Sequence, residues 1–287
     1  IATQNAKNVI LQKIREEERK VLYDQYYGME KEVVTGIVQR VMGKNVSVNL
    51  GKADGILSEN EQVKGEEFEP TERIKVYILE VKDTPKGPRI LLSRTHPGLV
   101  KRLFESEVAE VKDGTVEIKS IAREAGSRTK IAVWSNDPDV DPVGACVGMN
   151  GARVNSIVEE LRGEKIDIIN WDENPAILIE NALSPAKVIA VMADPDEKTA
   201  LVVVPDYQLS LAIGKEGQNA RLAARLTGFK IDIKSETQAR ESGELYDYDD
   251  EDEYYDEEEY SEEGAVESEE TETEETEEVS EETTVEE

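Results

Sequence analysis

The chain contains the sequences Gly148-Met149-Asn150-Gly151 and Gly214-Lys215-Glu216-Gly217, and each of these two Gly-x-x-Gly loops lies between two short helical patterns. The surroundings repeat with the loops, because GEKIDI at residues 163–168 follows the first loop and GFKIDI at residues 228–233 follows the second. The loops are offset by 66 residues and the lysines of the two following segments by 65. A near-constant offset of this kind indicates a duplicated structural unit.

The order of elements in each copy is helix, glycine loop, helix and apolar strand, which is the core of a KH domain. The loop of a KH domain clamps about four nucleotides of single-stranded RNA. Glycine lets the backbone approach a ribose-phosphate chain closely and adopt positive φ. The loop also opens the following helix, whose free N–H groups and dipole favour an anion. We therefore predict that both loops bind RNA, at Gly148, Met149, Asn150 and Gly151 and at Gly214, Lys215, Glu216 and Gly217, with bases in the adjacent apolar grooves.

Basic residues near the loops are further candidates for phosphate contact. Lys215 lies within the second loop, and Arg221 and Arg225 lie one helical turn apart on the helix that follows it. The first loop contains no base, and Arg153 is the nearest positive charge. We therefore expect the first unit to hold RNA more weakly than the second.

Several of these residues also have a purely structural interpretation. The first glycine of each loop is also a candidate helix C-cap, and the two arginines after the second loop are also candidates for solvated surface charges. Asp167 and Asp232 close the two copies at matching places, and we interpret them as strand-end residues rather than catalytic acids. His96, before Pro97 and Gly98, is interpreted as a domain-boundary residue.

Composition argues against an enzyme. No Ser/His/Asp, Walker or paired-carboxylate arrangement is present, and one cysteine with one histidine cannot form a Cys/His metal cluster. We expect no catalytic residue, metal or cofactor. Cys146 is expected to be a small buried side chain. The apolar stretches are too short to span a bilayer and no signal peptide is visible, so we expect a cytoplasmic protein.

The pattern along the chain predicts a multidomain α+β protein. Residues 1–29 read as a helix, and its apolar face is expected to pack on a region before Ile1, since the chain opens inside a helical pattern and is interpreted as a fragment. Residues 30–96 contain five short strands and predict a small OB-type barrel. Residues 97–171 and 172–238 are the two KH units. Within the second unit we expect a strand at 177–180 and a helix at 185–192.

The sequence of the predicted barrel indicates RNA binding less specifically than the two glycine loops do. Gly36 inside its first strand predicts a bulge or a barrel corner. Phe68 and Tyr77 are its only aromatic residues, and each is a candidate either for base stacking or for the core. We expect backbone contacts by outward-facing basic side chains, and we select Lys44, Arg73, Lys75 and Arg94 as the candidates.

Residues 239–287 are interpreted as a disordered acidic tail. Residues 241–287 hold 26 acidic residues and no Lys or Arg, which leaves 38 acidic and 34 basic residues in the body out of 64 and 34 in the chain. The net charge of −30 therefore describes the tail and does not exclude an RNA partner. The tail is either a solubilising appendage or a polyanion that competes with weakly bound RNA.

A barrel followed by tandem KH units resembles the NusA family of bacterial transcription factors, over roughly residues 1–238. The most specific stretch is QLSLAIGKEGQNARLAA at 208–224. Further stretches carry the resemblance at 103–108, 128–133, 141–148, 160–168 and 181–186. The resemblance implies that the barrel is an S1 domain and that both KH units are of type II. It implies a monomeric, non-enzymatic factor that binds RNA polymerase, single-stranded nascent RNA and other antitermination factors, and modulates pausing, termination and antitermination.

Two other functions and one packing prediction follow from the same residues. S1 and KH modules also occur together in ribosomal and RNA-decay proteins, and a purely structural assembly module would have no RNA affinity. The linker between the KH units is only DENP at 172–175, so we predict that they pack rigidly into one RNA-binding surface. Residues 1–29 resemble only the last helix of the family's polymerase-binding domain, so we expect this chain to bind polymerase poorly.

Overall fold

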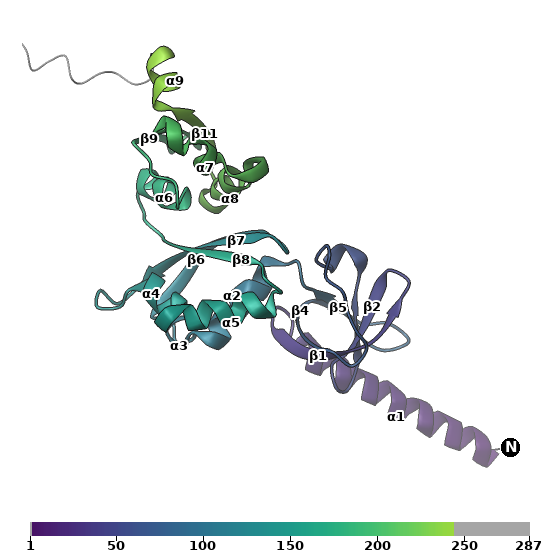
Figure 1. Ribbon diagram of the computed structural model, residues 1–287. Helices are drawn as coiled ribbons and strands as arrows, with labels where there is room; N and C mark the ends of the chain where they lie inside the picture. The colour runs from purple at the N-terminus through teal and green to yellow at the C-terminus, as the bar shows by residue number, and fades with distance from the viewer. Residues whose placement is uncertain (1, 244–287) are drawn as a thin grey trace, which may run out of the picture. The chain divides into compact units, whose positions relative to one another are not determined.

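The computed structural model describes residues 2–243 (Figure 1). Helix α1 (Ala2–Tyr27) comes first and ends at Gly28, whose N–H donates to the Asp24 carbonyl at 3.1 Å. Tyr26 near its end is buried and donates its hydroxyl proton to the Leu50 carbonyl at 3.1 Å, which fixes the helix to the barrel. Within residues 2–243 no helix is long and apolar enough to cross a membrane.

Five strands form a closed barrel in the order β1-β2-β3-β5-β4, as predicted. The strands are β1 (Val33–Met42), β2 (Asn45–Asn49), β3 (Asp54–Leu57), β4 (Arg73–Lys82) and β5 (Arg89–Ser93). A Cβ on Gly36 would lie 2.3 Å from Cγ1 of Val48, so glycine at this position permits close packing inside the barrel. The bulge in β1 falls between Val38 and Arg40, so the bulge expected at Gly36 is displaced along the strand.

The first KH unit has one sheet, in the order β6-β7-β8. Strands β6 and β7 are antiparallel, and β7 and β8 are parallel. Its elements are α2 (Pro97–Glu107), α3 (Ala109–Lys112), β6 (Val116–Glu124), β7 (Arg128–Ser135), α4 (Pro142–Val147), α5 (Ala152–Glu160) and β8 (Lys165–Asn170). Asp141 caps α4 by accepting from the N–H groups of Val143 and Gly144, at 3.1 and 3.0 Å.

The second KH unit repeats this order, with its sheet arranged β11-β10-β9. Again the last two strands, β10 and β11, are parallel and the first pair is antiparallel. Its elements are α6 (Pro175–Ala182), β9 (Ala190–Asp194), β10 (Thr199–Val204), α7 (Leu209–Ile213), α8 (Gln218–Thr227), β11 (Lys230–Ser235) and α9 (Glu236–Glu241). A helix before the first strand in both units is the predicted type II arrangement.

Two predicted elements of the second unit are wrong. Residues 177–180 belong to helix α6 rather than a strand, and residues 185–192 form a turn and the start of β9 rather than a helix. Asn174 explains the helix, because its side chain accepts from the Ala176 N–H at 3.0 Å and Pro175 takes the first helical position. The apolar run after it, which the sequence reasoning read as a strand, instead buries Leu178 and Ile179.

The predicted start of the tail at residue 239 is also too early. Ser235 and Gln238 form a reciprocal capping box that begins α9, so residues 236–241 are helical. Most of the predicted tail, and the hypothesis that it competes with RNA, lies outside the described residues.

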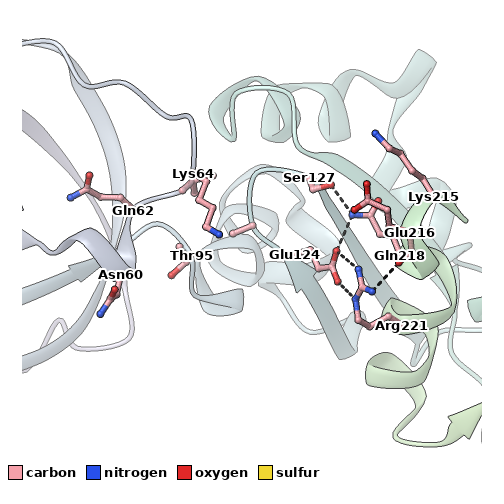
Figure 2. Close-up of a pocket in the computed structure, with 12 residues that line it drawn as sticks. Asn60, Gln62, Lys64, Thr95, Glu124, Ser127, Lys215, Glu216, Gln218 and Arg221 are labelled. Carbon is pink, nitrogen blue, oxygen red and sulfur yellow. Dashed lines mark hydrogen bonds and ion pairs between the residues drawn. The ribbon is translucent and has the colours of Figure 1, made fainter. Parts of the chain in front are cut away.

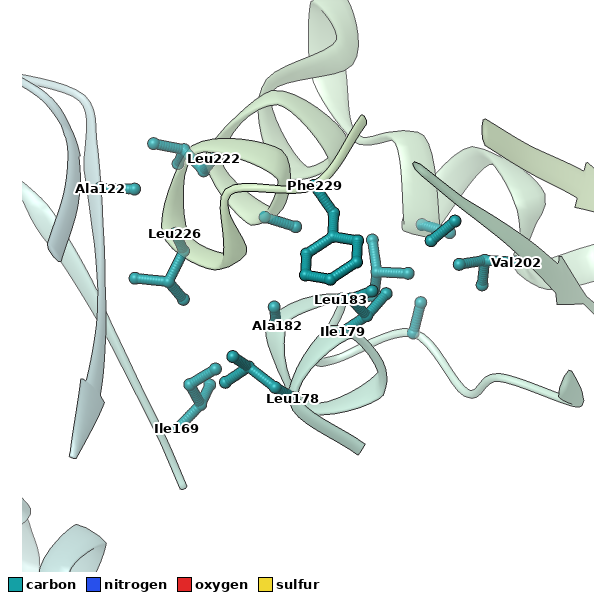
Figure 3. Packing of buried hydrophobic residues seen from close by; sticks show 14 of the residues in the cluster. Ala122, Ile169, Leu178, Ile179, Ala182, Leu183, Val202, Leu222, Leu226 and Phe229 are labelled. Carbon is teal, nitrogen blue, oxygen red and sulfur yellow. The ribbon is translucent and has the colours of Figure 1, made fainter. Parts of the chain in front are cut away.

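One hydrophobic cluster joins the two KH units (Figure 3). Side chains alternate along β7, so that Ile131 and Val133 pack on the first unit's own helices while Ala132 faces the second unit. Ala122 and Ile169 from neighbouring strands join Ala132 in that cluster, against Leu178, Leu226 and other residues of α6 and α8. The first unit's sheet is therefore covered on both faces and the two units share a cluster, while rigid packing into one RNA-binding surface stays a prediction.

A buried lysine sits at the same junction. Lys130 on β7 is fully buried; its ammonium group donates to the Ser184 carbonyl of the second unit at 2.8 Å and lies 3.3 Å from Asp167. Burial lowers the pKa of Lys130, against the opposing effect of Asp167. Asp167 also binds Arg128 at 2.6 Å, so this carboxylate has a structural role, as the sequence interpretation proposed.

Candidate nucleic-acid interface

The two glycine loops have the same backbone conformation although their central residues differ. Gly148 has φ 74° and ψ 175°, and Gly214 has φ 75° and ψ 173°. Asn150 and Glu216 are both left-handed, at φ 51° and 54°. The closing glycines, Gly151 and Gly217, are left-handed as well. The duplication inferred from sequence is therefore preserved at the level of backbone torsions.

The first glycine of each loop is required by geometry. Gly148 and Gly214 occupy a region of φ and ψ that is essentially restricted to glycine. A Cβ on Gly214 would lie 2.8 Å from Cβ of Asn219 and 2.9 Å from its backbone nitrogen. Both glycines also cap the preceding helix, since their N–H groups donate to Gly144 and Ser210 at 2.8 and 2.9 Å. The C-cap interpretation is therefore correct, and it coexists with an open loop.

The residue at the second position of the helix after each loop ties that helix to the one before it. In the second unit this residue is Asn219, whose buried amide donates to the Ala212 and Leu183 carbonyls, both at 3.0 Å. In the first unit it is Arg153, whose guanidinium donates to the Ala145 carbonyl at 2.6 Å and pairs with Glu110 at 3.0 Å. Arg153 was predicted to contact RNA, but its charge is engaged within the domain. Asn219 carried no charge and was missed by sequence reasoning.

Helix α7, directly before the second loop, exposes apolar surface beside that loop. Leu211 and Ile213 are 46% and 38% exposed, while the corresponding part of α4, Ala145 and Val147, is half-buried. Met149 in the first loop is 85% exposed. Each short helix packs against the last strand of its own sheet, α4 on β8 and α7 on β11. Helix α7 therefore presents more uncovered apolar surface beside its loop than α4 does, whereas in the first unit the most exposed apolar side chain is Met149 of the loop itself.

Of the basic side chains around the second loop, one is unpaired and two contact a carboxylate of the first KH unit. Lys215 is exposed and has no hydrogen-bond or ion-pair partner among residues 2–243, so its ammonium group is available to an anion. Arg221 instead donates to both carboxylate oxygens of Glu124 in the first KH unit, at 2.6 and 3.3 Å. Arg225 lies 3.8 Å from the same carboxylate. The two arginines share a face as predicted, and their side chains remain 44% and 56% exposed while they pair with a carboxylate of the other KH unit.

Three of the four barrel candidates reach the surface. Arg73 is exposed, Lys44 is exposed and pairs with Glu59 at 2.8 Å, and Lys75 is half-buried and lies 3.8 Å from Glu107. Arg94 is the exception, because only 2% of it is exposed and the prediction that it faces outward is wrong.

Arg94 is held at the junction of the barrel with the first KH unit. Its guanidinium pairs with the buried Glu66 at 2.5 Å, donates to the Lys75 carbonyl at 2.7 Å, and donates to the Glu160 carbonyl at 3.0 Å. Arg162 also reaches Glu66, at 3.2 Å. The sequence around Arg94 gave no signal that one of its partners, Glu160, would come from α5 of the first KH unit.

The aromatic candidates of the barrel are occupied by packing. Tyr77 is buried and stacks on His96 with ring centroids 4.7 Å apart. His96 caps α2 by accepting from the Gly98 N–H at 2.9 Å, which confirms it as a boundary residue. Phe68 is half-buried, with the Arg162 guanidinium 5.3 Å from its ring centroid. Base stacking and core packing were the two roles considered for these aromatic residues. Tyr77 has the core role, and the ring of Phe68 is covered by the arginine.

A cavity of about 640 Å³ links the two KH units. Its walls come from the start of α4, the end of β8, the end of α6 and the turn before β9. Its polar groups come from two carboxylates, two amides, a hydroxyl and one ammonium group, on Asp141, Glu180, Asn170, Asn181, Ser184 and Lys187. The Lys187 N–H donates to Gln208, just before α7, at 3.4 Å, so the cavity extends from the start of one glycine-loop helix towards the start of the other. Sequence reasoning did not select these residues, although 181–186 was among the recognised stretches.

Comparison with known proteins assigns all three domains. Residues 28–93 match the S1 RNA binding domain, residues 94–171 the NusA-like first KH domain, and residues 175–241 the NusA-like second KH domain. The chain is 60% identical over 243 residues to the transcription termination/antitermination protein NusA of Bacillus subtilis, covering 85% of this chain and 66% of that protein. It is 49% identical over 245 residues to the protein of the same name from Mycobacterium bovis, covering 82% and 71%.

A relative from Thermus thermophilus with the same name is 46% identical over 232 residues, covering 80% of this chain and 60% of that protein. The chain thus spans about two thirds of the length of these relatives. An S1 barrel followed by two NusA-like KH domains, together with these identities, shows that the chain belongs to the NusA family of transcription termination/antitermination proteins.

Proposed function

We propose that this chain is the RNA-binding part of a non-enzymatic transcription factor that acts with DNA-directed RNA polymerase on single-stranded nascent RNA. In this role it modulates pausing, termination and antitermination in the cytoplasm, as a monomer and together with other antitermination factors. The observation that carries the proposal is the pair of glycine loops with matching torsions, placed in two KH units that share one hydrophobic cluster.

The RNA contacts proposed for the loops are their backbone N–H groups and the Lys215 ammonium group. The exposed apolar side chains of α7 support base contact beside the second loop, and the half-buried surface of α4 supports a weaker contact beside the first. The cavity between the KH units supports a strand that passes from one groove to the other. In the barrel we retain Lys44, Arg73 and Lys75 as candidates for contact with the RNA backbone.

Membership of the NusA family favours this function over the alternatives of a ribosomal or RNA-decay protein. It also favours an RNA-binding role over a purely structural module, because one matched domain is named as RNA binding.

The test is a loop variant with two carboxylates, Lys215→Asp/Glu216→Asp, titrated with single-stranded RNA by fluorescence anisotropy. The glycines remain, and Asp tolerates the left-handed conformation at position 216. We expect affinity to fall about tenfold or more, because a charge-assisted contact of about 1.5–3 kcal/mol is replaced by repulsion.

The chain offers a matched control in Glu197→Asp/Lys198→Asp. This pair has the same composition and net charge change, and Lys198 is also left-handed, at φ 55°. It lies beside Phe229, past the far end of the ten-residue α8, about 15 Å from the loop along the helix axis. Equal affinity of the loop variant, the control and the unmodified protein would remove the second loop from the proposal.

The proposed association with RNA polymerase is tested by crosslinking the full-length protein in a stalled elongation complex. Crosslinking should map the KH units and the barrel to nascent RNA, and residues outside these domains to polymerase. One loop clamps about four nucleotides. If the protein protects an RNA segment no longer than this, the proposal of a surface that spans both KH units is contradicted.

A further inference from the structure

The β6–β7 hairpin of the first KH unit makes two polar contacts with the second unit, one buried and one at the surface. The buried contact is made by Lys130 on β7, whose ammonium group donates to the Ser184 carbonyl, 54 residues away. The surface contact is made by Glu124 on β6, which accepts from Arg221 (Figure 2). Ala122 of the shared hydrophobic cluster pairs with Lys130 across the ladder and is two residues from Glu124. Both contacts therefore lie on the face of the sheet that packs on the second unit.

The buried contact leads to the second glycine loop. Ser184 follows Leu183, whose carbonyl accepts from the Asn219 amide at 3.0 Å. Asn219 also donates to the Ala212 carbonyl of α7, and it packs so tightly on Gly214 that a Cβ there would lie 2.8 Å from its own Cβ. Two adjacent carbonyls of the α6–β9 turn are thus held from opposite sides, one by the first unit and one by the helix that begins at the loop.

The surface contact leads to the same loop. Arg221, which Glu124 holds, also donates to the Glu216 carbonyl within the loop at 3.1 Å (Figure 2). Solvent-exposed ion pairs contribute little to the free energy of packing. Of the two contacts, the buried one therefore restricts the position of the loop more strongly.

The hydrophobic cluster between the units does not by itself specify their alignment. The first unit contributes Ala122, Ala132 and Ile169 to it, so two of these three side chains are single methyl groups (Figure 3). Apolar contact is non-directional, whereas a hydrogen bond requires its donor and acceptor to be aligned. The cluster holds the units together, and the hydrogen bond from Lys130 to Ser184 defines where along the sheet the second unit sits.

Stability alone does not account for a buried lysine at this place. Removing an ammonium group from water costs free energy that an apolar side chain of similar volume would not incur. Asp167 offsets this cost from 3.3 Å, but the same carboxylate is shared with Arg128. The best-attested use of such buried polar groups is the choice of one register among several.

We propose that Lys130 is a positioning residue that fixes the second glycine loop relative to the first KH unit, so that the two loops present RNA with a single spacing. This inference rests on the proposed function, because it requires RNA bound by both loops. The spacing matters because a strand held at one loop reaches the other at an effective concentration set by the distance between them.

The experiment compares Lys130→Met with Lys112→Met. Methionine at position 130 keeps an unbranched apolar stem and removes the charge and the donor. Lys112 is exposed on α3, which packs on the opposite face of the sheet, so its replacement is a control with the same change of charge. Lys130→Gln, whose amide is too short to reach Ser184, is a second variant if methionine prevents folding. Thermal unfolding identifies the variants that fold.

The first measurement needs no RNA. Spin labels are attached at Lys101→Cys on α2 and Glu197→Cys in the β9–β10 turn, both exposed, in a Cys146→Ala background. Double electron–electron resonance then gives the distribution of distances between the two KH units. The unmodified lysine and the Lys112→Met control should give one narrow distribution. Lys130→Met should broaden it or move its maximum.

The second measurement compares oligoadenylates of about four and about nine nucleotides, which match one loop and both loops at about four nucleotides each. We expect the longer RNA to bind the unmodified protein more tightly. Lys130→Met should reduce that gain about fivefold or more and leave the affinity for the short RNA unchanged. A general loss of structure would instead weaken both RNAs.

The inference is overturned if Lys130→Met and its control give the same distance distribution. It is also overturned if the distribution changes but the gain with the longer RNA does not. If the unmodified protein binds the longer RNA no more tightly than the shorter one, the proposed surface spanning both loops fails instead, and the label distances still test whether Lys130 sets the spacing.

Discussion

Glu124 Oε1 accepts a hydrogen bond from Arg221 Nε at 2.6 Å, and this contact joins residues 97 positions apart in the chain. Gln218 strengthens the contact by donating to the other Glu124 oxygen at 2.9 Å and to Ser127 Oγ at 2.7 Å. Glu124 and Ser127 lie on or beside the β6–β7 turn of one KH unit, and Gln218 and Arg221 lie in the first part of α8 in the other. The second glycine loop is therefore held in place by the first KH unit.

The first prediction concerns the pH dependence of this contact. Hydrogen bonding by Arg221 lowers the pKa of Glu124, so the ionised pair adds stability above the ordinary value of 4.5 and loses it as the pH falls through the lowered value. Glu124→Gln should reduce the free energy of unfolding by about 0.2–1 kcal/mol at neutral pH, since Arg221 is 44% exposed and solvent screens the pair.

Urea unfolding measured between pH 7 and pH 3 checks this prediction. The difference between Glu124→Gln and the unmodified protein should shrink below pH 4.5. A difference that stays constant over that range would mean that the charge on Glu124 contributes nothing.

The second prediction ranks substitutions of the loop glycines. Gly214→Ala should cost more stability than Gly148→Ala, because the new Cβ meets the backbone nitrogen of Asn219 at 2.9 Å, whereas at Gly148 it meets the flexible side chain of Arg153 at 2.8 Å. The unfavourable torsions alone cost about 1–3 kcal/mol at either position.

Chemical denaturation measures both costs. Gly28→Ala is the control, because a Cβ there comes no closer than 3.6 Å to the neighbouring atoms and little change is expected. Equal stability of Gly214→Ala and Gly28→Ala would contradict the requirement for glycine in the loop.

The third prediction concerns the junction of the barrel with the first KH unit. Arg94→Met should lower the free energy of unfolding by about 3–5 kcal/mol, because it leaves the buried Glu66 without its main partner. Arg162, 3.2 Å from Glu66, compensates in part and favours the lower end of that range.

The double variant Arg94→Met/Glu66→Gln separates the lost ion pair from the lost packing. It should be more stable than Arg94→Met alone, because no buried carboxylate is left unpaired. If the double variant is less stable than Arg94→Met, the cost arises from packing and from the carbonyl contacts of Arg94.

The fourth prediction concerns the single thiol. Burial raises the pKa of Cys146 to about 12, so the reactive thiolate is scarce in the folded protein. Labelling by iodoacetamide at pH 8 should be slow in buffer and fast in denaturant, as followed by mass spectrometry. Rapid labelling of the folded protein would show that α4 opens frequently beside the first loop.

The sequence by itself determined the local features of this protein. The two loops were predictable because glycine is the residue that tolerates their torsions, and the five barrel strands because their apolar residues follow the period of a strand. The packing of one KH unit on the other was predictable because four residues of linker leave little freedom. Helix α6 was missed because a short apolar run fits a strand as well as a buried helix, and the capping signal at Asn174 was overlooked.

Only the tertiary structure decided what each arginine does. The sequence offered Arg94, Arg153, Arg221 and Arg225 to RNA, but their carboxylate partners lie far along the chain. Glu66 and Glu160 are 28 and 66 residues from Arg94, Glu110 is 43 residues from Arg153, and Glu124 is 97 residues from Arg221. A charge binds whichever opposite charge the fold brings within a few ångströms, and local sequence carries no record of that distance.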